Sequence, residues 1–88
     1  MFMKDIVTVM TAAGEFVGRL VKIDETGIVL YRPRLITFEG ESMGFARGIV
    51  ATGKVDPEEV TILAPIFMTP TDDEVSKAWQ TATTGIIL

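Results

Sequence analysis

The sequence predicts a mainly β protein, built as a small, strongly bent, five-stranded antiparallel barrel with a C-terminal α-helix. Short runs of β-branched and aromatic residues alternate with turns that contain Gly, Asp or Pro, which is typical of antiparallel strands. Gly18 and Gly48 lie inside two of these runs, where a residue without a Cβ atom marks a bulge or a tight bend. After residue 70 the apolar residues recur at a helical period, so a helix follows the strands.

The first two strands are predicted at residues 6–11 and 15–24. The first run reads Ile-Val-Thr-Val-Met-Thr, and residues 12–14 turn the chain into the second. Residues 25–27 form the next turn, where Gly27 suits the positive φ that short hairpins often need.

The other three strands are predicted at residues 28–38, 45–52 and 60–67. Pro33 interrupts the third strand, and because proline has no N–H to donate, it predicts a kink or an unpaired edge there. Pro65 is expected near the end of the fifth strand or on a free edge.

The predicted helix begins with a capping box at Thr71 and Glu74, whose side chains would satisfy free backbone N–H groups. Gly85 is expected to end the helix. The apolar tail is expected to lie in a groove. Residues 1–68 would form the barrel, with residues 69–88 packed on the same domain. One apolar stripe should pack on the barrel or on a neighbour: Val75, Ala78, Trp79 and Ala82.

The composition excludes most catalytic chemistry. The chain has 88 residues, enough for one domain, and contains neither Cys nor His. This excludes disulfides, the usual zinc sites, and Ser-His or Cys-His pairs. The carboxylate groups lack the spacing of a calcium loop, and no carboxylate or Lys has an evident catalytic partner. We therefore predict a protein that is not an enzyme and that uses no cofactor or metal.

Composition also bears on location and assembly. No apolar stretch of about 18 residues is present and no secretion signal is evident, so the cytoplasm is the expected location. Apolar residues make up 48% of the chain, and a second copy could cover the excess. The net charge of -4 works against a broad phosphate-binding surface.

The segment from Gly18 to Leu30 resembles the first motif of the Sm-like (SH3-like) family. Gly18 is followed by Leu20, by the Ile23-Asp24 pair and by the apolar run that begins at Ile28. This pattern is most similar to the bacterial Sm-like RNA chaperone, and the resemblance extends over residues 5–67. Small phage-encoded Sm-like proteins are the subgroup that would tolerate a helix after the barrel rather than before it.

Two positions depart from the family pattern. Ile28 stands where eukaryotic Sm proteins usually carry Asn, and the Arg-Gly pair of the second motif is replaced by Gly53 between Thr52 and Lys54. The resemblance implies a homo-oligomeric ring of about five to seven subunits, in which residues 45–52 of one copy pair with residues 60–67 of the next.

In ring-shaped relatives, two pore-side loops bind single-stranded, uridine- or adenine-rich RNA. The positions that the resemblance assigns to this task are Asp24, Glu25, Thr26, Gly27, Ile28, Thr52, Gly53 and Lys54. Asp24 also has a structural interpretation, because an Asp at this point of a turn accepts hydrogen bonds from its own backbone.

Tyr31 and Arg32 are further candidates for RNA contact, because an aromatic ring beside guanidinium groups suits base stacking or the rim of a polar interface. The other aromatic residues are expected in the core or an interface. The alternative function is a structural or protein-interaction ring without RNA, for example a phage component, in which the helix and the tail at residues 86–88 dock a partner or a neighbouring subunit.

Overall fold

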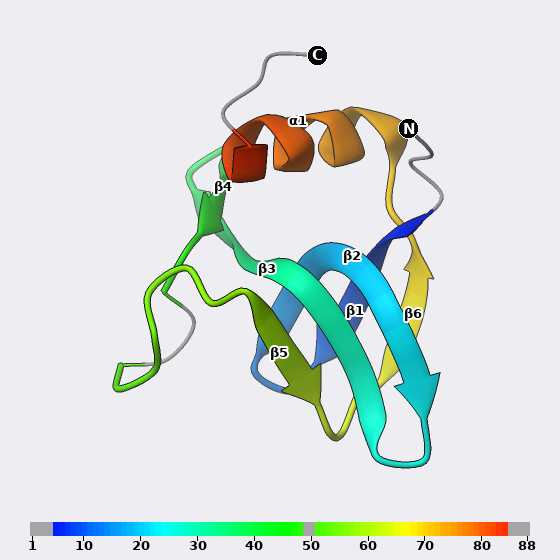
Figure 1. Cartoon of the computed structure of the whole chain (residues 1–88). Helices are drawn as coiled ribbons and strands as arrows, with labels where there is room; N and C mark the ends of the chain where they lie inside the picture. Colours follow the sequence, from blue (N-terminus) through cyan, green and yellow to red (C-terminus); the bar gives the residue numbers. More distant parts are fainter. Residues whose placement is uncertain (1–4, 49–50, 85–88) are drawn as a thin grey trace.

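The computed structural model describes residues 5–48 and 51–84, which form one antiparallel sheet and one helix (Figure 1). The mainly β class with a C-terminal helix is therefore confirmed, with six strands instead of five. The elements are β1 (Ile6–Thr11), β2 (Gly14–Asp24), β3 (Gly27–Glu39), β4 (Ser42–Ala46), β5 (Glu59–Ile62), β6 (Phe67–Pro70) and α1 (Asp73–Thr84).

The sheet is organised around β3, its longest strand. The strand order is β4-β3-β2-β1-β6, and β5 also pairs with β3. The edge of β3 that faces away from β2 carries β5 along Ile28–Tyr31 and β4 along Leu35–Glu39. The strands β4 and β5 therefore follow one another along the same edge of β3.

The sheet of the described residues is open, so the predicted barrel is not shown. In the described ranges, β6 pairs with β1, and no ladder joins β6 to β4 or β5. Residues 63–66 carry the chain from β5, beside β3, to β6, on the outer edge of β1. One short connection thus links the two outer edges of an open sheet.

The predictions for the first three strands are confirmed to within one residue at each end. The prediction of a bend is also confirmed. The β2–β3 register shifts between Val17 and Arg19, so Gly18 lies opposite a bulge at residues 32–33. A Cβ atom on Gly18 would lie 3.1 Å from Leu30 Cβ, tighter than most such contacts, so the bulge favours glycine there.

The predicted bounds of the last two strands are wrong. The fourth strand is β4 at residues 42–46, because Gly40, with φ 64°, allows a two-residue turn that pairs Glu39 with Ser42. Gly48 lies beyond this strand in an isolated bridge to Val55. The predicted fifth strand is two strands, β5 and β6, and Pro65 lies in the connection between them.

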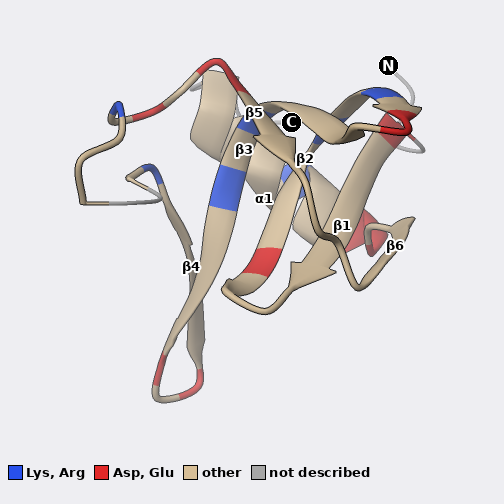
Figure 2. Ribbon diagram, turned by 90° about the horizontal axis from the view of Figure 1, so that it is seen from below, with Lys and Arg blue, Asp and Glu red and all other residues tan. Residues whose placement is uncertain are grey.

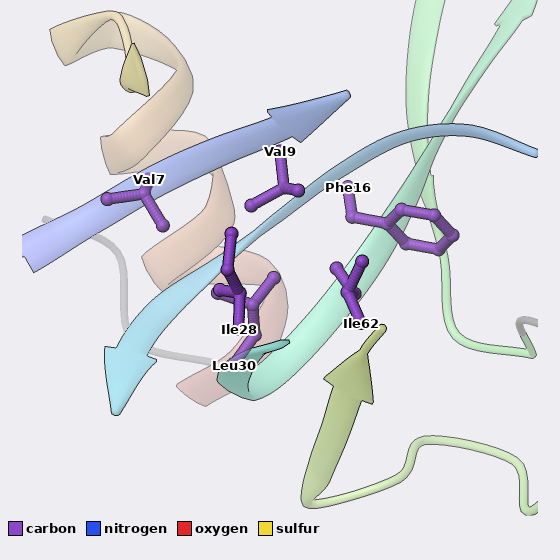
Figure 3. Packing of buried hydrophobic residues seen from close by; sticks show 6 residues of the cluster. All are labelled: Val7, Val9, Phe16, Ile28, Leu30 and Ile62. Carbon is purple, nitrogen blue, oxygen red and sulfur yellow. The ribbon is translucent and has the colours of Figure 1, made fainter. Parts of the chain in front are cut away.

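Apolar residues are buried on both faces of the sheet. Adjacent residues of a strand point to opposite faces, so Ile6 and Val7 enter different clusters, as do Val17 and Phe16. The second cluster brings α1 onto the sheet and consists of Ile6, Val17, Ile36 and Trp79. Figure 3 shows the first, which is formed by strands alone: Val7, Val9, Phe16, Ile28, Leu30 and Ile62.

The helix N-terminus is capped by Asp72 and not by Thr71. The Asp72 carboxylate accepts hydrogen bonds from the backbone N–H of Glu74, at 3.0 Å, and of Val75, at 3.3 Å. The Thr71 hydroxyl instead bonds to the Thr8 hydroxyl at 2.9 Å, which ties the start of the helix to β1. The predicted capping box is wrong because this long-range contact takes the Thr71 side chain.

The buried face of α1 also differs from the predicted stripe. Trp79 is buried and Val75 half-buried, but Ala78 and Ala82 are exposed. The helix turns in this way because the Trp79 indole N–H donates to the Arg32 carbonyl at 3.0 Å. The predicted end at Gly85 and the tail lie outside the described residues. The polar residues that share the buried face are Ser76, Gln80 and Thr83.

Candidate interaction surfaces

The β2–β3 turn is held in shape by Asp24. Its carboxylate accepts hydrogen bonds from the backbone N–H of Thr26 at 2.9 Å and from the Thr26 hydroxyl at 2.5 Å, and it pairs with Lys22 at 3.3 Å. The bond from the Thr26 hydroxyl is the main cause that lowers the pKa of Asp24 to about 2. Asp24 therefore has the structural role that its place in a turn predicts.

Two of the predicted RNA-binding positions next to this turn belong to the packing of the sheet. Gly27 has a φ of 143°, and a Cβ atom there would lie 2.2 Å from the Ile62 carbonyl oxygen. Ile28 is buried in the strand cluster. Asp24, Glu25 and Thr26 of this turn are all exposed, but the Thr26 hydroxyl donates to the Asp24 carboxylate.

The second predicted loop is exposed and lies far from the first. Thr52, Gly53 and Lys54 are all exposed, in the segment that follows β4. The isolated bridge between Gly48 and Val55 closes this segment. Figures 1 and 2 place it and the β2–β3 turn at opposite sides of the molecule. A single chain therefore does not bring the two predicted loops together.

Tyr31 and Arg32 lie at a junction of β3, β5 and α1. The Arg32 guanidinium stacks over the Tyr31 ring, with Cζ 5.7 Å from the ring centroid, and donates to the Thr83 carbonyl. The Arg32 backbone N–H donates to the Glu58 carbonyl at 2.6 Å. Arg32 has a φ of 50° and forms part of the bulge that the helix covers. Its side chain is therefore directed into the fold.

Arg34 makes an ion pair that the sequence analysis missed. Its side chain is buried, and its guanidinium lies 2.7 Å from the Asp56 carboxylate. Asp56 has a φ of 56°, and its backbone N–H donates to the Arg47 carbonyl at 3.1 Å. The sequence showed Asp56 only as part of an Asp-Pro turn, and no local pattern predicts a partner so far away in the chain. The pair holds the segment after β4 against the bulge of β3.

Large apolar side chains are exposed in several places. Phe38 is 69% exposed and Met43 is 41% exposed, and the two are cross-strand partners in the β3–β4 hairpin. Such residues on a small protein are typical of an interaction surface when they gather in one place. The others are Val21, Ile23, Val55, Leu63, Ile66 and Phe67.

Two strand edges are also free within the described ranges. In these ladders β4 pairs only with β3, and β6 pairs only with β1. An edge strand presents unpaired N–H and C=O groups, which can accept a strand from another chain.

The grouping of acidic side chains and the length of the helix bear on metal ions and membranes. In the part of the chain that the structure describes, no group of three or more His, Cys, Asp or Glu side chains is placed to hold a metal ion. The described helix is too short to span a bilayer. Comparison with family models, with curated proteins and with solved structures gives no match to this chain. The geometry of the described residues therefore carries the argument about function.

Proposed function

We propose that this chain is a non-enzymatic, Sm-like protein that assembles into a homo-oligomeric ring of about five to seven subunits. The observation that carries the proposal is the pair of unpaired strand edges, on β4 at one end of the sheet order and on β6 at the other. A head-to-tail contact that closes on itself satisfies both edges in every subunit.

A bent barrel is the finer form of this proposal. Support comes from residues 63–66, which cross between the outer edges of β3 and β1. The bulge opposite Gly18 supplies the curvature that this crossing needs. The Sm-like motif around this glycine and the Ile23-Asp24 pair are consistent with the same shape.

The contact between subunits takes a revised form. Residues 60–67 are not one strand, and β5 is already paired with β3 on one side. We therefore place the contact between β4 of one copy and β6 of the next. The exposed Phe67 on β6 would then be covered by the neighbouring subunit.

Light scattering and sedimentation of the full chain at micromolar concentration test the proposal. The expected mass is that of a closed ring. Phe67→Lys should lower the mass, since a charged residue on an edge strand disfavours the addition of another strand. Val21→Lys is the matched control, because Val21 is an exposed apolar residue on the interior strand β2. A monomer at every concentration would remove the ring.

Binding of single-stranded RNA is a second candidate function, favoured by the exposure of Lys54 and Arg47 in the segment after β4. Copies of these cations around a ring would gather phosphates, although Glu25 repels them at the other predicted loop. Labelled uridine- and adenine-rich oligonucleotides at low salt provide the test. If Lys54→Glu still binds RNA, the loop at Lys54 is not the binding site. If the parent chain does not bind RNA, this candidate function is excluded.

A further inference from the structure

We propose that the tip of the β3–β4 hairpin of one copy docks on the segment after β4 of a second copy. The hairpin tip comprises residues 38–43, and the docking segment is defined by Arg47, Lys54 and Val55. This inference rests on the proposed self-assembly. It adds a contact between side chains that is separate from the pairing of strand edges.

The hairpin tip is both apolar and acidic. Phe38 and Met43 are paired across the hairpin and exposed, and Glu39 and Glu41 lie beside them around the turn. Figure 2 shows the tip projecting from the sheet with its acidic residues on both sides of the turn. An exposed Phe–Met pair with charged neighbours is suited to a partner that is apolar at its centre and basic around it.

The docking segment has the complementary character. Arg47 and Lys54 are exposed, and Val55, the bridge partner of Gly48, is 67% exposed. The Asp56 carboxylate is bound to Arg34, and the exposed Glu58 and Glu59 lie further along the chain, where β5 begins. The bridge from Gly48 and the ion pair at Asp56 hold Val55 in place, so less conformational entropy is lost when Val55 binds.

The partner must be another copy, because one chain cannot join its own two surfaces. The hairpin tip ends at Met43, the second residue of β4, whereas Arg47 follows the last residue of that strand. The four residue steps from Met43 to Arg47 along β4 hold these surfaces about 13–14 Å apart. Figure 2 shows them at opposite ends of that strand. Two complementary surfaces at opposite ends of one element predict a head-to-tail contact, which can close into a ring.

Charge reversal in the full chain tests the contact. We expect Glu39→Lys with Glu41→Lys, and separately Arg47→Glu with Lys54→Glu, each to raise the concentration of half-assembly at least about tenfold, through like-charge repulsion. All four changes in one chain should restore assembly, because the charges are again opposite. Lys77→Glu is the control for the loop variant, since Lys77 is exposed on α1 away from both surfaces.

The apolar part of the contact has its own test. Phe38→Ser should weaken assembly and Val21→Ser should not, as both side chains are exposed but only Phe38 lies on the tip. Circular dichroism and the fluorescence of Trp79 verify that each variant is folded. Unchanged assembly of folded charge-reversed variants would overturn this inference and leave the ring intact. The contact would also be overturned if the variant that carries all four charge changes stayed dissociated. A monomeric parent chain would overturn both this inference and the ring.

Discussion

The two halves of β3 are both apolar, but they differ in what covers them. Residues 27–31 lie between β2 and β5, and Ile28, Val29 and Leu30 are all buried. Residues 35–39 pair with β4, and β2 reaches them only at Leu35. Ile36 is still buried, in the cluster that contains Trp79 of α1, but Phe38 is exposed. The strands and the helix that each residue meets, and not its hydrophobicity, therefore decide whether it joins the core.

The bulge between the halves explains the change. Trp79 and Glu58 bind the backbone of Arg32, and Asp56 binds the side chain of Arg34. These long-range contacts place β5 on one side of the bulge and leave the other side to the hairpin. The first half of β3 therefore contributes to stability. We predict that the exposed end of the second half contributes to assembly.

The sharpest contrast comes from truncating one residue in each half. Leu30→Ala should lower the free energy of unfolding by about 2–5 kcal/mol, because Leu30 is fully buried and its loss leaves a cavity. Phe38→Ala should change it by less than about 0.5 kcal/mol in the monomer, because Phe38 is exposed. Urea unfolding at one low protein concentration measures both. Equal losses of unfolding free energy in the two variants would contradict the difference between the two halves of β3.

Trp79 tests whether the helix is needed to hold the bulge. Trp79→Phe keeps an aromatic ring but removes the donor to the Arg32 carbonyl, and we expect a loss of about 1–3 kcal/mol. Thermal and urea unfolding followed by circular dichroism measure the change. Ala82→Ser, at an exposed position of the same helix, is the control and should be almost neutral. A neutral Trp79→Phe would mean that the bulge stands without the helix.

The ion pair provides a smaller test of the same bulge. Asp56→Asn leaves the buried Arg34 without its carboxylate, which costs about 3–5 kcal/mol for fully buried pairs. The Asp56 side chain is 38% exposed and water screens it, so we expect about 1–2 kcal/mol. Glu58→Gln is the matched control at an exposed acid of the same segment. Arg34→Met in the Asp56→Asn background should recover part of the loss, and no recovery would contradict the buried pair.

The smallest expected effect is at the β2–β3 turn, at the start of the first half of β3. The pKa of Asp24 is lowered from 3.8 to about 2, so its stabilising contribution is present above pH 3.8 and is lost as the pH falls through about 2. Carboxyl carbon shifts in an NMR titration measure this pKa. Thr26→Ala should raise it more than Lys22→Ala does, because the hydroxyl bond is the larger cause. A larger rise in the pKa of Asp24 from Lys22→Ala than from Thr26→Ala would show that the ion pair with Lys22 is the main cause.

Several features of this fold depend only on residues that are close together in the chain, and the sequence predicts them. The first three strands, the positive φ at Gly27, the bend at Gly18 with its kink at Pro33, and the final helix are all local choices of turn and period. The role of Asp24 in the candidate site is also predicted from the sequence, because an Asp at this position of a turn is expected to order that turn.

Other features depend on contacts between distant parts of the chain, and these emerge only from the folded structure. The Thr8 hydroxyl takes the side chain that would have capped the helix, and the Arg32 carbonyl sets which face of the helix is buried. Long-range contacts also produce the Arg34 ion pair and leave Phe38 exposed. They separate the two predicted RNA loops as well. Apolar period and turn chemistry act over a few residues, whereas burial depends on which strands meet, and that is settled by packing over the whole domain.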